Sequence, residues 1–142
     1  MKLISFLVLV VSPLLSTGQT KKIVSFKTSS EIVYAAIDRA GDFYVVLQSG
    51  LILKYDKDGA KLGTYSHIGV PTLFDPSNAI RLLVYYNHAQ EFSWLSPDLS
   101  VNPFQTIDSS IAIEATLICP SGDHNLWVLD DADLSLKKVS LL

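Results

Sequence analysis

Short apolar runs separated by turn-forming residues predict β-strands along most of the chain. In the first unit, Glu31–Ile37 is an apolar run that indicates a strand buried on both faces, and Phe43–Gln48 has no polar residue until its end. After the Ser49-Gly50 turn, apolar and polar residues alternate along Leu51–Asp56, and a further turn leads into Ala60–Tyr65. The pattern therefore predicts four short strands joined in up-and-down order.

The same rhythm continues through two further units. In the second unit, the later strands are predicted at Ile80–Tyr86, Glu91–Leu95 and Asn102–Ile107. The third unit begins near Ile113, and its last predicted strand is Leu134–Val139. Turn-forming Pro, Ser, Asn, Asp and Gly residues separate these runs.

A repeat relates the first unit to the third. Gly41-Asp42 matches Gly122-Asp123, 81 residues later, and Leu51–Lys54 matches Leu134–Lys137, 83 residues later. Two similar offsets indicate units of about forty residues, which is the spacing of four-stranded propeller blades. We therefore predict an all-β fold that is β-propeller-like, with about three four-stranded antiparallel blades.

The blades are predicted in one domain over residues 19–142, at residues 31–66, 71–108 and 113–142. In the third unit Leu142 is equivalent to Gly59, so the third blade lacks its fourth strand. A three-stranded blade would expose an open edge. We expect Lys21–Lys27, a surplus β-prone run that precedes the first blade, to pair with the last blade and close it.

The number of blades leaves the ring incomplete. Propellers close with about four to eight blades, and this chain supplies just under three. The chain is a truncated product, or two copies join into a six-bladed ring as a homo-oligomer, or the blades form an open, curved array. Truncation is favoured, because unpaired hydrophobic blade faces are costly, and a truncated chain is expected to associate.

The first eighteen residues predict a secretory signal peptide. Lys2 provides the charged start, Leu3–Val11 is almost wholly apolar, and Ser16–Gly18 offers small residues at a cleavage site, so we expect cleavage near Gly18. The apolar run is shorter than the roughly twenty residues of a membrane span. We expect a secreted or periplasmic bacterial protein with no membrane span.

The single cysteine, Cys119, allows no intramolecular disulfide and lies in an apolar run as a small hydrophobe.

Composition and charge exclude one class of partner. The chain has 142 residues, which is enough for one domain, and its 49% hydrophobic content is inflated by the N-terminal segment. The formal net charge is −3, with 11 lysines and arginines in total and no basic run longer than two. We therefore expect no nucleic-acid partner.

Several segments resemble the blades of NHL-type and TolB-type six-bladed propellers. The first blade carries the resemblance in Ile37-Asp38, Gly41–Val46 and Leu51–Gly59, because in such blades a Gly-Asp-aromatic segment forms the second strand and an FDxDG-like turn follows the third. Further segments are similar to uncharacterised secreted bacterial members, namely Arg81–Tyr86, Trp94–Leu99 and Asn125–Asp130. The resemblance implies a binding scaffold, although a fold alone does not fix a function.

Two acidic segments raise the question of a metal site. Asp56–Gly59 begins like a calcium loop, but its glycine comes two residues early and no acidic residue follows until Asp75, so we interpret it as a turn. The cluster of Asp130, Asp131 and Asp133 is also interpreted as a solvated hairpin. The histidines are isolated in three different turns, and they are His67, His88 and His124. We assign no metal ligand and no cofactor.

No catalytic pattern is evident either. No serine lies in a G-x-S-x-G elbow, and spacing alone assigns no Ser-His-Asp triad. The aromatic residues on predicted strands are expected to pack between blades, although a few exposed ones would suit a sugar or peptide; they are Tyr85, Tyr86, Phe92, Trp94 and Trp127.

The sequence thus favours a non-enzymatic, exported binding or scaffold module. Its partner would be a protein, peptide or glycan, held by loops at one end of the blades. The alternative is a fragment or subunit of a metal-dependent propeller hydrolase similar to lactonases. In such enzymes Glu, Asn and Asp bind a divalent metal at the centre of the ring. Glu31 or Glu114 with Asn78 would mimic that set in principle, but one chain with so few blades cannot assemble the central site.

Overall fold

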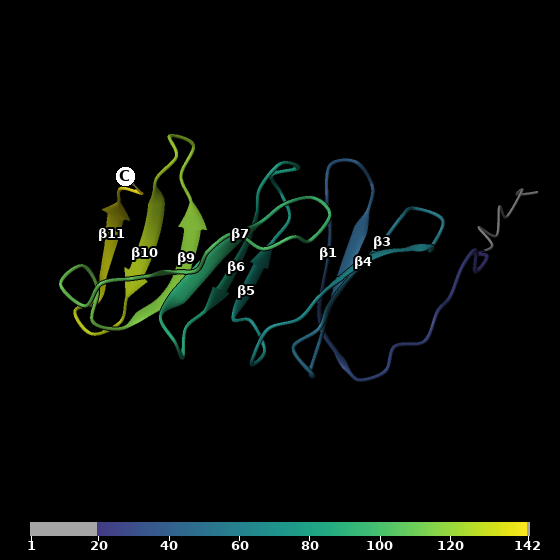
Figure 1. Cartoon of the computed structure of the whole chain (residues 1–142), viewed down its shortest axis with the longest axis horizontal. Helices are drawn as coiled ribbons and strands as arrows, with labels where there is room; N and C mark the ends of the chain where they lie inside the picture. Colours follow the sequence, from purple (N-terminus) through teal and green to yellow (C-terminus); the bar gives the residue numbers. More distant parts are fainter. Residues whose placement is uncertain (1–19, 142) are drawn as a thin grey trace, which may run out of the picture.

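The computed structural model describes residues 20–141, and these residues form an all-β fold. Eleven strands make three antiparallel sheets that lie side by side in a row (Figure 1). No helix of the described residues is long and apolar enough to cross a membrane. The predicted fold class is confirmed, whereas the predicted signal peptide lies outside the described residues.

Each sheet is built from strands that are consecutive in sequence. The first sheet contains β1 (Ile32–Ile37), β2 (Phe43–Leu47), β3 (Ile52–Tyr55) and β4 (Lys61–Tyr65). The second contains β5 (Leu73–Asp75), β6 (Leu82–Tyr86), β7 (Glu91–Leu95) and β8 (Gln105–Thr106). The third contains β9 (Ala115–Pro120), β10 (Leu126–Asp130) and β11 (Ser135–Val139). In the described part of the chain, the third sheet has three strands, as expected.

Strand β6 organises the packing because it is buried on both faces. Leu82, Val84 and Tyr86 belong to the apolar cluster shared with the first sheet. Leu83 and Tyr85 belong to the cluster shared with the third sheet. All five side chains are 0% exposed. Alternate residues of one strand therefore join the second sheet to both of its neighbours.

The two sheet interfaces are filled mainly by apolar side chains. At the first interface, β6 meets residues of the first sheet, among them Tyr44, Val46, Ile52 and Tyr65. At the second interface, it meets residues of the third sheet, among them Ala115, Ile118, Leu126 and Val128. A polar contact also crosses the first interface, where Lys54 Nζ donates to the carbonyl oxygen of Pro97 at 2.9 Å.

A five-residue turn recurs between strands, and it corrects the alignment of the repeats. In each copy the first backbone N–H donates to the fifth carbonyl and the fourth residue has positive φ. Glycine takes the fourth position at Gly41, Gly50 and Gly59, but Leu99 and His124 take it in the other two copies. The residue equivalent to Gly41 is therefore His124, 83 residues later, and the predicted match with Gly122 is wrong by two residues. Spacing in sequence misled because left-handed backbone does not require glycine.

The prediction that Glu31–Ile37 is buried on both faces is wrong. β1 is largely exposed, and Tyr34 and Ile37 are 47% and 66% exposed. β1 pairs only with β2 and lies at the edge of its sheet. An apolar run indicates a strand, but its burial depends on neighbouring segments, and none of the described segments covers this edge.

The prediction that Lys21–Lys27 closes the last blade is also wrong. The segment forms no strand, and Phe26 stacks on Phe43 and Tyr55 of the first sheet, with ring centroids 5.3 and 4.4 Å apart. The third sheet lies at the opposite end of the row, beyond the second sheet (Figure 1). The segment instead covers part of the outer face of the first sheet, where Val45 and Leu53 are buried.

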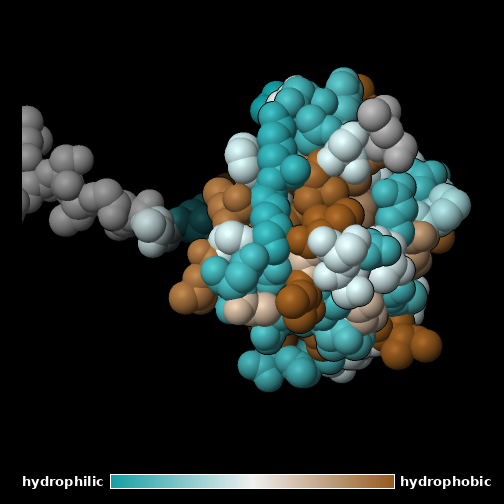
Figure 2. Space-filling model, turned by 90° about the vertical axis from the view of Figure 1, so that its left-hand side faces the viewer, coloured by the Kyte–Doolittle hydropathy of each residue, from teal (hydrophilic) through white to brown (hydrophobic). Residues whose placement is uncertain are grey.

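The outer face of the third sheet remains open. Leu117 and Leu136 flank Leu129 across the three strands and are 48% and 63% exposed. Cys119 pairs with Trp127 beside them and is exposed rather than part of a core. Figure 2 views the molecule from this end, where hydrophobic surface shows between hydrophilic side chains. We call this apolar surface the end face.

Truncating β6 tests its two-sided role. We expect Leu82→Ala and Leu83→Ala each to lower the free energy of unfolding by about 2–5 kcal/mol, because each removes buried volume at a different interface. Urea denaturation measures the loss. Ile80→Ala is the control, because Ile80 is 76% exposed just before the strand; it should cost less than about 0.5 kcal/mol. A large loss for only one of the two leucines would contradict burial on both faces.

A charge on the end face tests whether it drives association. We expect the molar mass of the protein, measured by light scattering, to rise with concentration. Leu136→Lys should weaken this association roughly tenfold, or by about 1.4 kcal/mol, because it places a charge within the apolar patch. Ile68→Lys is the control, since Ile68 is 84% exposed away from that face. Equal association of both variants would show that the end face is not the contact.

Candidate functional site

The turns between first and second strands, and between third and fourth strands, lie at one end of the sheets. This arrangement follows from the up-and-down order of the strands. We call it the turn end, and it contains residues 38–42, 56–60, 76–81, 96–100 and 121–125. The hairpins between second and third strands lie at the opposite end with the segments that connect the sheets.

A cleft opens at the turn end between the second and third sheets. Two cavities of about 300 and 600 Å³ share the lining residues Arg81, Trp94, His124 and Asn125. Arg81 precedes β6, Trp94 lies on β7, and the other two belong to the turn between β9 and β10. We call this the Arg81 cleft.

The Arg81 side chain is held against an aromatic ring. Its guanidinium carbon lies 4.3 Å from the centre of the Trp94 ring, which is cation–π distance. Trp94 is itself 7% exposed and meets Phe92 edge to face at 6.5 Å between ring centres. The packed sheet thus fixes the ring, and the ring orients the guanidinium.

The opposite wall of the cleft carries His124 and an ionised carboxylate, Asp123, that is paired with a lysine. Asp123 accepts hydrogen bonds from the Lys138 ammonium and the Ser121 hydroxyl, and these bonds hold the pKa of Asp123 well below its usual range. His124 has a φ of 65° and takes the left-handed position of the turn. The acid beside the cleft is therefore already paired with a cation.

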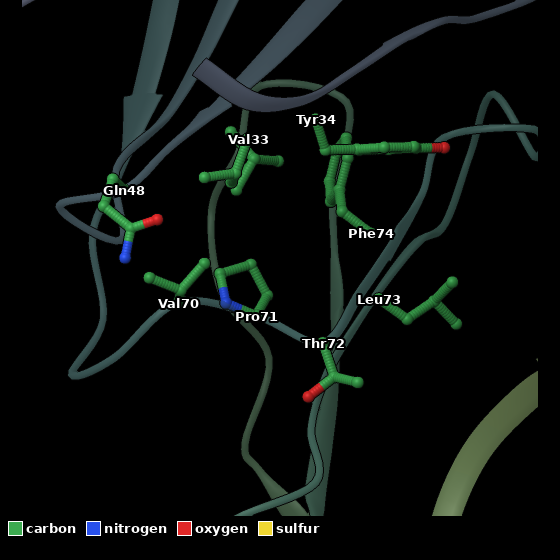
Figure 3. Close-up of a pocket in the computed structure, with 9 residues that line it drawn as sticks. Val33, Tyr34, Gln48, Val70, Pro71, Thr72, Leu73 and Phe74 are labelled. Atoms are coloured by element: carbon green, nitrogen blue, oxygen red, sulfur yellow. The ribbon is translucent and has the colours of Figure 1, made fainter. Parts of the chain in front are cut away.

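A second, apolar pocket lies between the first and second sheets. Its volume is about 400 Å³. Figure 3 shows Val33 and Tyr34 on one side and Val70, Pro71 and Thr72 on the other. The Thr72 hydroxyl donates to Asn87 Oδ1 at 2.8 Å, and Gln48 adds an exposed amide to a lining that is otherwise mainly apolar. This pocket suits an apolar group, and it offers little to select one ligand from another.

The interpretation of the acidic cluster in the last hairpin as solvated is wrong for Asp130, which is buried and bonded within the fold. Asp130 is 0% exposed, and its carboxylate accepts the backbone N–H groups of Ile113 and Glu114 at 3.1 and 3.0 Å. Lys137 Nζ lies 2.6 Å from Asp130 and 2.8 Å from Asp133. Asp131 is exposed. The cluster ties the chain before β9 to the hairpin between β10 and β11.

The other residues considered from the sequence lie apart. Asp56 Oδ1 accepts the N–H groups of Asp58 and Ala60 at 2.9 and 2.8 Å, so the turn interpretation of Asp56–Gly59 is confirmed. Among residues 20–141, no three His, Cys, Asp or Glu residues are grouped as a metal site. Asn78 Oδ1 accepts the N–H of Ile80, while Glu31 and Glu114 are exposed just before the first strands of the first and third sheets.

The histidines are not brought together. His67 Nε2 lies 3.2 Å from Glu91 Oε1, and its ring stacks on Phe104 with centroids 4.4 Å apart. His88 meets the edge of Tyr86 at the opposite end from His124. Of the three, only His124 lines the Arg81 cleft.

Sequence reasoning missed the pairing of Arg81 with Trp94. Both residues were part of strand patterns, but their contact depends on the register that places Leu83 opposite Trp94. A signal was present, because Arg81 is one of only two arginines in the chain and immediately precedes an apolar strand.

Comparison with known proteins supports the fold alone. No family model and no curated protein matches the chain. A crystal structure of a protein of unknown function from Bacteroides caccae is similar, with a TM-score of 0.54 and 14% identity over 75% of this chain and 44% of that one. A catalytically inactive virginiamycin B lyase from Staphylococcus aureus, with Quinupristin, has a TM-score of 0.50 and 11% identity over 75% of this chain and 40% of that one.

These comparisons and the three stacked sheets define a β-propeller-like protein. The chain spans less than half the length of either of these two structures. At 11–14% identity, no residue role transfers from them.

The buried acid gives a prediction about pH. The hydrogen bond from Lys137, opposed by burial and reinforced by backbone donors, holds the pKa of Asp130 well below its usual range. A lowered folded pKa contributes stability that is fully present above the unfolded value of about 3.9 and is lost as the pH falls toward the folded value. Asp130→Asn should therefore destabilise the protein at pH 7 and do so less at about pH 3.

Urea unfolding at the two pH values measures this difference. Asp131→Asn is the control, because Asp131 is exposed one residue away and should change stability little at either pH. A penalty for Asp130→Asn that is the same at both pH values would show that the charge of Asp130 does not contribute.

Proposed function

We propose that this protein is a non-enzymatic, exported binding module that holds a protein, peptide or glycan at its turn end. The observation that carries the proposal is the Arg81 cleft, which combines a fixed aromatic side chain, an unpaired cation and turn residues from two sheets. Clefts with a few convergent polar groups on a rigid scaffold are the usual form of a binding site.

The destination and the kind of propeller are part of the same proposal. The apolar segment after Lys2 supports export to the periplasm or outside the cell. The Gly-Asp-aromatic segment at Gly41 supports kinship with NHL-type or TolB-type six-bladed propellers. The exposed apolar residues of the end face support a second contact surface there. Its occupant would be either further blades or a second copy of the chain that completes the ring.

A steric block at the turn end tests the proposal. Binding of the protein to peptide and glycan arrays should identify ligands, and Gly122→Tyr should weaken their binding at least tenfold. Gly122 has open space around its α-carbon and no positive φ, so the turn accepts a side chain there. Ser49→Tyr places the same group on an exposed hairpin at the opposite end and should leave binding unchanged. Loss of binding in Ser49→Tyr alone would move the site away from the turn end.

The alternative function, part of a metal-dependent hydrolase, is tested by adding metal. We expect the melting temperature to stay constant with millimolar calcium or zinc, because the acids of the last hairpin bond to Lys137 and to backbone N–H groups. A real site would stabilise the fold by about 2.7 kcal/mol at one hundred times its Kd. A rise in melting temperature that is abolished by replacing Asp130, Asp131 and Asp133 with asparagine would favour the hydrolase.

A further inference from the structure

The Arg81 guanidinium is held in one orientation but forms no ion pair or side-chain hydrogen bond with the described residues. The six ion pairs of the described residues all use a lysine or histidine as the cation. None of their carboxylates pairs with Arg81, and no described hydrogen bond uses its guanidinium as donor, while the residue is exposed at the mouth of the cleft. The guanidinium carbon lies 4.3 Å from the centre of the Trp94 ring, and this stacking restricts rotation of the Arg81 side chain. Its planar N–H donors are therefore available to a partner outside the described residues.

The surroundings of Arg81 favour a carboxylate as that partner. A guanidinium binds a carboxylate through two parallel hydrogen bonds, which match its flat geometry. Asn125 and His124 line the same cavity, so their polar groups lie where a carboxylate or the chain that carries it would enter. The competing acid, Asp123, is already held by Lys138 and Ser121.

The ring of Trp94 helps to choose between a peptide and a glycan. One face of the indole is covered by Arg81, and the side chain is only 7% exposed. Little aromatic surface is therefore left in the cleft for a sugar ring to stack on. The larger of the two cavities, about 600 Å³, is lined by residues of two turns and by Ser140, which follows β11.

We propose that the Arg81 cleft binds an acidic peptide, with a glutamate or aspartate carboxylate on the Arg81 guanidinium. This inference rests on the proposed function and specifies its ligand. The indole N–H of Trp94 has no hydrogen-bond acceptor among the described residues and reports on the cleft directly.

An NMR titration tests the inference with two matched peptides, acetyl-Gly-Glu-Gly-amide and acetyl-Gly-Gln-Gly-amide. The glutamate peptide should shift the signals of the Trp94 indole N–H and the 121–125 amides in a saturable way, and the glutamine peptide should bind at least tenfold more weakly. Glucuronate, added separately, carries the same carboxylate on a sugar. Tighter binding of glucuronate than of the glutamate peptide would overturn the choice of a peptide.

Substitutions then assign the contact. Arg81→Gln should weaken binding of the glutamate peptide at least tenfold, and Arg81→Lys should restore it only in part, because lysine keeps the charge but loses the paired donors. Lys27→Gln removes an exposed cation from the segment that precedes the first sheet, outside the turn end, and should change binding less than twofold. Equal binding by Arg81→Gln and the native protein would overturn the inference.

The two levels of the proposal fail differently. If array ligands are blocked by Gly122→Tyr but not by Arg81→Gln, the turn end is a binding face and the acidic-peptide inference is wrong. If neither the array ligands nor the glutamate peptide binds at the turn end, the proposed function is wrong as well.

Discussion

The packing of three sheets against one another through β6 is the constraint on which the rest of this structure depends. A single antiparallel sheet of short strands has two faces to cover, and here only the second sheet has a sheet on each side. Leu82 and Leu83, which are adjacent in sequence, are fully buried at opposite interfaces. The outer sheets each bury one face in this way, and their other faces meet a coil segment or solvent. Stability is thus concentrated at the centre of the row.

The Arg81 cleft is a consequence of the same packing. Trp94 and Leu83 pair across β6 and β7, and both belong to the cluster that joins the second sheet to the third. The turn that carries His124 reaches the cleft because the third sheet packs there. The proposed binding function at the turn end would therefore use a rigid wall from one sheet and a turn from the next. This division is typical of scaffolds that present variable loops on a fixed core.

Local features of the sequence were predicted well, whereas features that depend on distant segments were not. Glu91–Leu95 has the predicted bounds because its pattern and flanking turns are local. The predicted Asn102–Ile107 strand shortens to Gln105–Thr106, beyond Pro103, which lacks an N–H for the ladder. The exposure of β1, the position of Phe26 and the contact between Arg81 and Trp94 all depend on which sheets are neighbours. A pattern within one strand cannot contain that information.

Native-state hydrogen exchange tests the central claim most directly, because amide protection reports the stability of each strand. Two-sided burial predicts that the hydrogen-bonded amides of β6 are the most protected in the protein. Those of β1 and β11, at the open edges of the outer sheets, should exchange orders of magnitude faster. Protection of β6 no greater than that of β1 would contradict the account, because it would mean that the central strand does not hold the sheets together.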